Sequence, residues 1–408
     1  LDSLVEGEQE YTFDLGNNLG PNFTVLGLET EQYRIEGSVL TIEDGAISSV
    51  TWVSAGAGGA LEETVKNAFT LALGEGSAAN VSLGYLNGTL TTSGDKVYQI
   101  TNTGGTKINL NGVYNRGETL PSGNLNYRGD IWMDISGGAF GIISGGVTNE
   151  WSTKLQTSTL TGDTHVQLSG NATAEHVIGG NNKGASTTLT GNTNVTVKDN
   201  AIVAGAIIGG STSAHNAVTT ITGNTSVLVT NVQYSNTAQN LDGGLSNSYI
   251  IGGSSWSSNT TSGTTIQGST SATINLNGTE EHNSFVKTII GGSYGNVNNA
   301  GTVNNINGDT SVSIIGREGI TFTGDIIGGS FENSGQAQYT IGGNSSISIS
   351  GGSTFTGNIY GGSYSKVPGN TGSTMTTAGN ITVELGTGTY RGNIYGAGNK
   401  GTAGGDVL

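Results

Sequence analysis

Three aspartates could form the carboxylate pair of a polysaccharide-cleaving enzyme: Asp163, Asp309 and Asp325. Glycoside hydrolysis uses two carboxyl groups that face one sugar bond about 5–9.5 Å apart. Asp163 and Asp309, however, follow a glycine at a position that other parts of the chain fill with asparagine, as at Asn192 and Asn224. Both residue types accept hydrogen bonds from nearby backbone in turns. The sequence therefore favours a structural role for these carboxylates, in which each bonds its own backbone.

The one dense ionisable cluster is Glu280, Glu281 and His282. No partner cluster elsewhere would complete a metal or acid–base site, so a solvated loop is the favoured interpretation. His165 alternates with Val166 on a predicted strand, which places the imidazole on the exposed face. The chain contains no cysteine, which excludes thiolate nucleophiles, disulfides and Cys-ligated metals. We expect no catalytic residue, no metal and no cofactor.

One short pattern recurs between Gly162 and Asn399 and must position these residues. It begins with a turn, Gly-[Asn/Asp/Ser]-[Thr/Ser], followed by alternating apolar residues and later by a corner of two apolar residues and Gly-Gly. The turns begin at Gly162, Gly191, Gly223, Gly268, Gly308, Gly343 and Gly379, and the corners at Val177, Ile207, Ile250, Ile289, Ile326 and Ile359, with an altered copy at Ile394. The second glycines of successive corners are 30 to 43 residues apart, which indicates a repeat architecture.

Each repeat contains three short segments with the pattern of a half-buried strand. The first follows the turn, the second is the apolar pair, and the third carries one apolar residue among Thr and Asn: Leu189, Ile221, Ile266, Ile306, Ile341 and then Ala378. Stacked repeats can pair in register at about 4.8 Å per coil. We therefore predict an all-β fold, a right-handed parallel β-helix (a solenoid with three strands per coil), with Ile208, Ile251 and Ile290 in a column inside the tube. Helical periodicity, four-stranded blades and the hexapeptide rhythm of left-handed β-helices are missing.

Composition agrees with this fold and excludes several classes of partner. The 408 residues include 71 Gly and 3 Pro, and only 11% are charged. A net charge of −16 argues against nucleic acid and anionic membranes, because binding to either requires basic patches. No apolar run approaches the roughly 20 residues of a spanning helix, so no membrane insertion of this fragment is expected.

We predict two domains. Residues 1–78 would form a small N-terminal α/β cap over the open edge of the first coil, and residues 79–408 the β-helix, truncated in mid-repeat. Short strands are predicted at 33–35, 39–42, 49–53, 97–100, 108–110 and 131–135. One helix is predicted from the spacing of Leu61, Val65, Ala68, Phe69 and Ala72.

Two longer spacers mark a candidate binding side of the tube. Residues of about 232–248 and 278–287 are inserted at the same point of neighbouring repeats, so they should project together. Insertions on a solenoid commonly gather on a working face, although drift in tolerated loops gives the same pattern. The ligand-binding candidates here are Tyr234, Asp242, Glu280, Glu281 and His282.

Aromatic residues also recur after the corners, at Trp256, Tyr294, Phe331 and Tyr364. Stacked aromatic rows that stiffen the sheet are the favoured interpretation. The alternative is a platform for carbohydrate, because aromatic faces together with Asn and Thr side chains suit sugars. These four residues are therefore further ligand-binding candidates.

The repeats Gly-Asn-Ile-Tyr-Gly-Gly-Ser (357–363) and Gly-Asn-Ile-Tyr-Gly-Ala-Gly-Asn (392–399) resemble those of bacterial surface β-helix proteins, in particular the passenger regions of autotransporter adhesins. The resemblance covers residues of about 130–408. It implies export, display at the bacterial cell surface, a C-terminal anchoring part beyond this fragment, and adhesion or self-association. The Gly-Asp-Ser-Gly motif of the passengers that carry a serine protease domain is absent.

From these observations we expect a cell-surface adhesin or stalk that presents polar groups to host glycans, glycoproteins or sister molecules. A polysaccharide-active β-helix enzyme, either a lyase or a glycoside hydrolase, is the alternative from another class. An inert spacer is the third hypothesis, favoured if the two insertions are disordered and lie apart.

Overall fold

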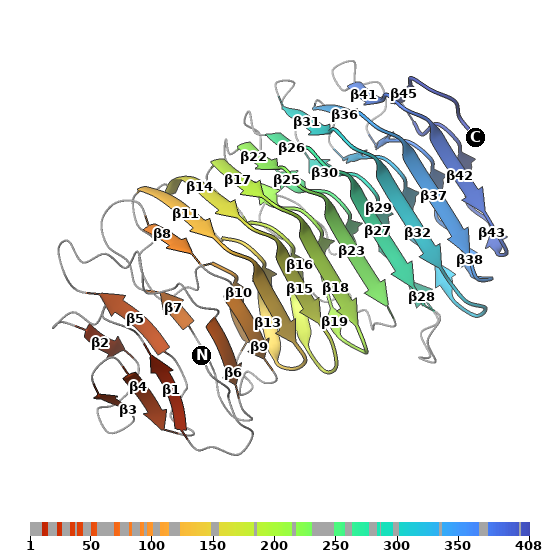
Figure 1. The fold of residues 1–408 in the computed structure, drawn as a ribbon. Coiled ribbons are helices and arrows are strands. Elements are labelled where there is room, and N and C mark those ends of the chain that lie inside the picture. Colours follow the sequence, from red (N-terminus) through yellow and green to blue (C-terminus); the bar gives the residue numbers. More distant parts are fainter. Residues whose placement is uncertain are drawn as a thin grey trace.

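The computed structural model is a tube of stacked parallel coils that advance along one axis (Figure 1). It describes residues 10–14, 23–26, 33–36, 39–43, 50–54, 69–73, 81–83, 90–93, 96–100, 107–113, 123–147, 155–182, 186–213, 218–230, 249–257, 263–276, 284–285, 287–296, 302–333, 337–366, 374–399 and 401–408. Within these ranges no helix has the length and apolar character needed to cross a membrane.

Three long parallel sheets, here called sheets I, II and III, form the walls of the tube, and the chain steps through them in turn. Sheet I contains β6 (Phe69–Leu73), β9 (Lys96–Ile100), β12 (Ile131–Ile135), β15 (Thr164–Leu168), β18 (Thr193–Lys198), β23 (Thr225–Thr230), β27 (Thr270–Asn275), β32 (Thr310–Ile315), β37 (Ser345–Ser350) and β42 (Ile381–Leu385). Sheet II contains β10 (Lys107–Asn111), β13 (Ala139–Ser144), β16 (Thr173–Ile178), β19 (Ile202–Val203), β20 (Ile207–Ile208), β24 (Tyr249–Ile251), β29 (Thr288–Ile290), β34 (Ile326–Ile327), β39 (Ile359–Tyr360) and β44 (Ile394–Tyr395). Sheet III contains β8 (Leu90–Ser93), β11 (Gly123–Arg128), β14 (Leu155–Thr161), β17 (Ser186–Thr190), β22 (Val218–Ile221), β26 (Gly263–Ile266), β31 (Val303–Ile306), β36 (Gln338–Ile341), β41 (Thr374–Thr377) and β45 (Gly401–Ala403).

Two smaller parallel sheets occupy corners of the tube. Sheet IV, between sheets II and III along the chain, contains β21 (Thr212–Ser213), β25 (Ser255–Ser257), β30 (Tyr294–Asn296), β35 (Phe331–Glu332) and β40 (Tyr364–Ser365). Sheet V, between sheets I and II, contains β28 (Ser284–Phe285), β33 (Thr321–Phe322), β38 (Thr354–Phe355) and β43 (Thr389–Tyr390). The predicted all-β parallel β-helix with three main strands per coil is confirmed, and its right hand stays a prediction.

Like residues stack on like residues because successive coils pair in register. In sheet I, Val195 pairs with Val227, and in sheet III, Leu189 pairs with Ile221. These inward residues fill the tube with one continuous apolar core, and Leu189 and Val197 are 0% exposed. Ala378 was predicted as the inward residue of the last sheet III strand in this series, and this prediction is wrong. Thr377 pairs with Ile341 and is buried instead.

The apolar pair of each corner divides between two cores. Ile207, Ile250 and Ile289 belong to the core inside the tube. Ile208 and Ile251 stack as predicted, but they belong to a second cluster, together with Tyr294 of sheet IV. The prediction that this column lies inside the tube is wrong, because neighbouring residues of a strand face opposite sides. The apolar pairs of sheet II from β20 to β39 are therefore buried on both faces of the sheet.

The corner after each apolar pair is held by a ladder of serines. Each serine hydroxyl accepts a hydrogen bond from the backbone N–H of the corresponding residue in the preceding coil. The donor–acceptor pairs are Asn181 to Ser211 at 2.9 Å, Ser211 to Ser254, Ser254 to Ser293 and Ser293 to Ser330 at 3.1 Å, and Ser330 to Ser363 at 3.0 Å. Glycine is required beside this ladder, since a Cβ on Gly209 would lie 2.4 Å from the carbonyl oxygen of Gly252.

The described residues of the N-terminal part form strands. β1 (Glu10–Asp14) and β3 (Tyr33–Glu36) flank β4 (Val39–Glu43) antiparallel, and β5 (Val50–Ser54) pairs with β2 (Phe23–Leu26) and β7 (Val81–Leu83). The short strands predicted in this part and the first coils, at 33–35, 39–42, 49–53, 97–100, 108–110 and 131–135, are confirmed.

The predicted N-terminal helix is wrong where it can be checked. Phe69 and Ala72 lie in β6, which pairs with β9 as the first strand of sheet I. Their segment also alternates with period two, and pairing to a neighbouring coil favours the strand. Leu61, Val65 and Ala68 lie outside the described residues. The division at residue 78 stays a prediction, although β6 already belongs to sheet I.

Removing one rung of the inner column should destabilise the tube. Ile250 is 0% exposed and has Ile207 and Ile289 above and below it. We expect Ile250→Ala to lower the free energy of unfolding by about 2–5 kcal/mol, because it leaves a cavity. Leu228→Ala, at a residue that is 38% exposed, is the matched control and should change it by less than about 0.5 kcal/mol. Chemical denaturation followed by circular dichroism measures both, and equal effects would contradict the assigned core.

Candidate functional site

The three candidate carboxylates are parts of hydrogen-bonded ladders along the tube. At the start of sheet I, each side-chain oxygen accepts a hydrogen bond from the backbone N–H of the equivalent residue one coil later. Asp163 Oδ1 accepts from Asn192 at 2.7 Å, and Asp309 Oδ1 accepts from Asn344 at 2.6 Å. The column, here called the Asx ladder, runs through Asp130, Asp163, Asn192, Asn224, Ser269, Asp309, Asn344, Asn380 and Asp406.

Asp163 and Asp309 accept backbone hydrogen bonds, as predicted, but the prediction that each bonds its own backbone is wrong. The acceptor reaches the next coil rather than its own backbone, because in-register stacking brings that N–H closer. Asp325 begins a second ladder of the same kind, in which its Oδ1 accepts from Asn358 at 2.8 Å and Asn358 accepts from Asn393 at 3.0 Å. Each of the three carboxylates therefore already accepts a hydrogen bond from a backbone N–H.

The aromatic residues after the corners cover the outer face of sheet II. Tyr294 is 0% and Phe331 is 5% exposed, and their ring centroids lie 5.5 Å apart. Phe331 also stacks on the half-buried Tyr364 at 5.3 Å. This geometry supports the stiffening row and contradicts the carbohydrate platform at Tyr294 and Phe331. Burial also raises the pKa of the Tyr294 hydroxyl far above its ordinary value.

Trp256 does not continue this row. It pairs with Gly295, and Ser255 occupies the position opposite Tyr294. The corner before it contains one more serine than the later corners, and this extra residue shifts the tryptophan by one position. Its side chain lies outside the described residues, as do Tyr234, Asp242, Glu280, Glu281 and His282 of the two insertions.

Lys287, at the end of the second insertion, is buried rather than displayed. Its ammonium group donates to the carbonyl oxygens of Ala204, at 3.3 Å, and of Gly205. Gly205 lies 82 residues earlier in the chain and two coils before Lys287. The coil between them carries the longer of the two insertions. Burial lowers the pKa of Lys287 to about 7. This contact joins two coils that are separated by one coil in the stack.

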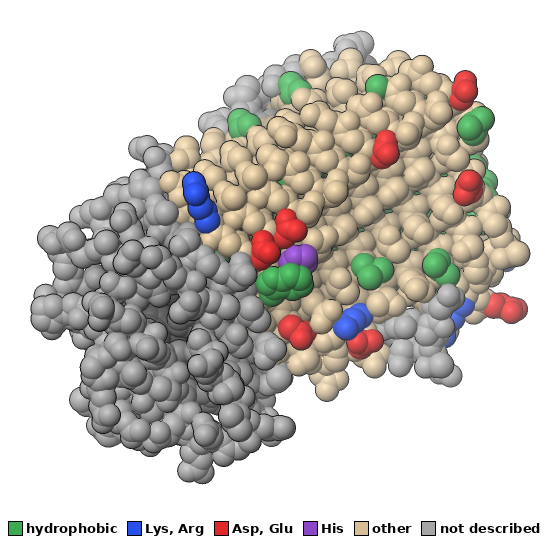
Figure 2. All heavy atoms as spheres, in the orientation of Figure 1, with side chains coloured by type: hydrophobic (Ala, Val, Ile, Leu, Met, Phe, Trp, Pro, Cys, Tyr) green, Lys and Arg blue, Asp and Glu red, His purple; other side chains and the backbone are tan. Residues whose placement is uncertain are grey.

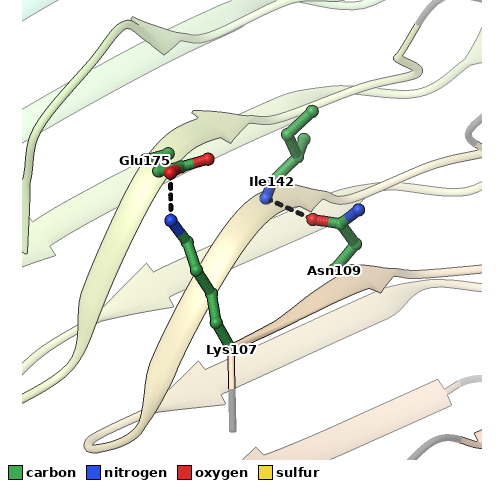
Figure 3. A network of polar contacts seen from close by, with 4 residues as sticks. All are labelled: Lys107, Asn109, Ile142 and Glu175. Carbon is green, nitrogen blue, oxygen red and sulfur yellow. Dashed lines mark hydrogen bonds and ion pairs between the residues drawn. The ribbon is translucent and has the colours of Figure 1, made fainter. Parts of the chain in front are cut away.

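A second lysine side chain spans one coil on the outer face of sheet II (Figure 3). The Lys107 ammonium of β10 pairs with the Glu175 carboxylate of β16, although β13 lies between these strands. Gly141 of β13 leaves this space free, and Asn109 Oδ1 accepts from Ile142 N at 2.8 Å beside it. The ion pair is partly exposed, so its contribution to stability is small.

One described carboxylate lies deep in the fold. Glu332 of β35 is 0% exposed and accepts a hydrogen bond from the Tyr339 hydroxyl of β36. Burial, and then the adjacent carboxylate, hold the pKa of Tyr339 well above its ordinary value. This pair fastens sheet IV to sheet III.

An aromatic pair that was not predicted from the sequence lies on the outer face of sheet I. Trp132 of β12 stacks on His165 of β15 with ring centroids 3.6 Å apart and an interplanar angle of 9°. Trp132 is 46% exposed and His165 is partly exposed, in agreement with its predicted outward direction. Both residues stand two positions after a member of the Asx ladder, Asp130 and Asp163, so aligning the sequence on that ladder would have found the pair.

The outer face of sheet III has a different character. A single column of nearly uniform side chains runs along it, each partly or fully exposed: Asn126, Thr159, Thr188, Thr220, Thr265, Asn305, Thr340, Thr376 and Thr402. From β14 to β45 no strand residue of this sheet is charged. In the orientation of Figures 1 and 2 these strands lie along the upper edge of the tube, where few charged side chains are seen. We call this column the threonine ladder.

Comparison with protein families, curated proteins and solved structures finds no match. Among the described residues, no group of three or more His, Asp or Glu side chains could hold a metal ion. The threonine ladder and the surface around Trp132 and His165 are the two described surfaces with a distinct composition.

Asp309 offers a test of the ladder role. We expect Asp309→Asn to change the free energy of unfolding by less than about 0.5 kcal/mol, because the amide oxygen can still accept from Asn344 N. Asp309→Ala removes the acceptor and should lower it by about 0.5–1.5 kcal/mol. Thermal and denaturant unfolding compare the two, and an equal loss in both variants would contradict a hydrogen-bonding role.

The buried ammonium of Lys287 predicts a dependence of stability on pH. Its folded pKa of about 7 lies below the ordinary value of 10.5, so between these values the unfolded chain binds a proton that the folded chain lacks. The free energy of unfolding should therefore rise with pH above about 7, by at most about 1.4 kcal/mol per pH unit. Lys287→Met should remove this rise. Denaturant titrations of both proteins test it below about pH 10, where tyrosines of the unfolded chain begin to ionise, and parallel curves would contradict it.

Proposed function

We propose that the protein is a cell-surface adhesin or stalk, in which a stiff β-helix presents neutral polar ladders to glycans or glycoproteins. The supporting observation is the threonine ladder, whose members repeat once per coil on a sheet face that has no charged strand residue from β14 to β45. Hydroxyl and amide groups both donate and accept hydrogen bonds, as the hydroxyls of sugars do. Such a face therefore suits a neutral, hydroxyl-rich partner better than a charged one.

Repetition compensates for the weakness of each contact. A single exposed hydrogen bond contributes only about 0.5–1.5 kcal/mol net. The ladder places equivalent groups about 4.8 Å apart along a rigid axis, so one extended glycan can contact several coils without a further loss of freedom in the protein. The serine and Asx ladders supply that rigidity because they fix successive coils to one another.

An enzymatic role receives no support from the candidate carboxylates. Asp163, Asp309 and Asp325 each accept a backbone hydrogen bond within a ladder. Export and display at the bacterial surface are part of the proposal and rest on the resemblance of residues of about 130–408 to autotransporter passengers. An inert spacer would show the same fold without glycan binding.

Substitutions in three consecutive coils test the proposal. The triple variant Thr188→Val, Thr220→Val and Thr265→Val keeps the shape and removes three hydroxyls of the ladder. We expect it to weaken binding to neutral glycans about tenfold on an immobilised glycan panel. The matched triple variant with serine keeps the hydroxyls and should bind as the unaltered protein does.

Three results would contradict the proposal. The valine variant could bind as tightly as the serine variant, the unaltered protein could bind no glycan, or it could cleave a polysaccharide. Circular dichroism of both triple variants confirms that the fold is retained before affinities are compared.

A further inference from the structure

The surface around Trp132 and His165 differs from the rest of sheet I in its chemistry. Along the strand direction, Asp130 and Asp134 stand two residues before and after Trp132, at about 6.6 Å each. On the next coil, Asp163 precedes His165 by the same interval. An exposed indole is thus flanked by carboxylates on both sides. Figure 2 shows a histidine and a hydrophobic side chain in contact, with acidic side chains nearby, on a face that is otherwise largely uncharged.

Hydrogen bonds hold these side chains in a fixed arrangement. Gln167 Nε2 donates to Asp134 Oδ1 at 2.9 Å, and Asp163 N donates to Asp130 Oδ1 at 2.8 Å. On the other side of the histidine, Asn194 Nδ2 lies 3.4 Å from His165 Nδ1. The tryptophan therefore packs against neighbours that are themselves held by hydrogen bonds. This limits the side-chain conformational entropy that the protein would lose on binding.

The electrostatics of the surface favour a cation. Three carboxylates lie within two strand residues of the aromatic pair, and partial burial lowers the pKa of His165, against the opposing effect of Asp163 and Asp130. This shift favours the neutral imidazole. Among the described side chains, the basic residue nearest in sequence is Arg128, which is exposed at the end of β11 in sheet III. Lys96 of β9 pairs with Ile131 beside Trp132, and its side chain lies outside the described residues. A cation above the indole would gain cation–π attraction as well as attraction to the carboxylates.

The surrounding groups favour a sugar over a peptide as the carrier of that cation. Both edges of β12 are already paired, with β9 and with β15, so a peptide could not add to the sheet through its backbone. The neighbouring outward side chains on the following coils, Asn194, Thr196 and Ser226, are amides and hydroxyls that match sugar hydroxyls. A metal ion is not favoured, since no described cluster could hold one.

We propose that Trp132, His165, Asp130, Asp134 and Asp163 form a binding site for a glycan that contains an amino sugar with a free, protonated amine. The amine lies between the indole and the carboxylates, and the adjoining sugar units extend over Asn194 and the following coils. This site rests on the proposed glycan-binding function and names a ligand class for one place on the tube, separate from the threonine ladder.

Isothermal titration calorimetry of the full chain tests the site with a tetramer of β-linked glucosamine, at a pH where its amines are protonated. The matched ligand is the N-acetylated tetramer, which has the same linkage and no charge. We expect the glucosamine tetramer to bind at least about tenfold more tightly. Trp132→Ala and Asp134→Asn should each weaken its binding about fivefold or more, whereas Trp132→Phe should retain most of it.

Glu384→Gln is the control variant. Glu384 is an exposed carboxylate on the same outer face of sheet I, in the column of Asp134 but at the far end of the tube, and its loss should leave binding unchanged. The proposal is overturned if the two tetramers bind equally, if Trp132→Ala binds as the unaltered protein does, or if Glu384→Gln weakens binding as much as Asp134→Asn. Tighter binding of tetralysine than of the glucosamine tetramer would assign the site to basic peptides and would also overturn it.

The two proposals can fail separately. If the valine triple variant of the threonine ladder binds neutral glycans normally while Trp132→Ala loses the glucosamine tetramer, only the ladder proposal is contradicted. If the valine variant loses neutral glycans while the glucosamine tetramer binds no better than its acetylated form, only the amino-sugar site is contradicted.

Discussion

The fold depends on one constraint, which is that every coil must match the coils above and below it residue by residue. Parallel strands satisfy their backbone groups only between coils, so a coil has no stability by itself. The in-register pairing of Val195 with Val227 and of Ile208 with Ile251 shows how strictly this rule is kept. Where the match is interrupted, long side chains cross the gap, as Lys107 does above Gly141 and Lys287 does toward Gly205.

Most of the architecture follows from local sequence periodicity. Alternation and the recurring Gly-Gly corner were sufficient to predict the three main strands of each coil and the parallel stacking, but not the short strands of sheets IV and V. They could not assign the two residues of the apolar corner to different cores, because nothing local indicates that the aromatic residues of sheet IV cover the outer face of sheet II. The segment at Phe69–Leu73 was ambiguous for a related reason, since a short apolar run fits both periods and pairing with β9 decides between them.

The surface was harder to predict than the core. Trp132 and His165 are 33 residues apart in the chain, and only register brings their rings together. The same register moves Trp256 out of the aromatic row through a single additional residue. Site residues in a solenoid are therefore best sought by aligning the coils on a conserved internal ladder, here the Asx position, and by comparing the outward side chains column by column.

The serine and Asx ladders have a directional consequence. In the Asx ladder each side chain accepts from the following coil, whereas in the serine ladder each hydroxyl accepts from the preceding coil. The two faces of any coil are therefore chemically unlike, with side-chain acceptors and backbone donors exchanged between the two corners. A coil stacked in the same orientation places a backbone donor opposite a side-chain acceptor at both corners, so the two ladders extend together as coils are added.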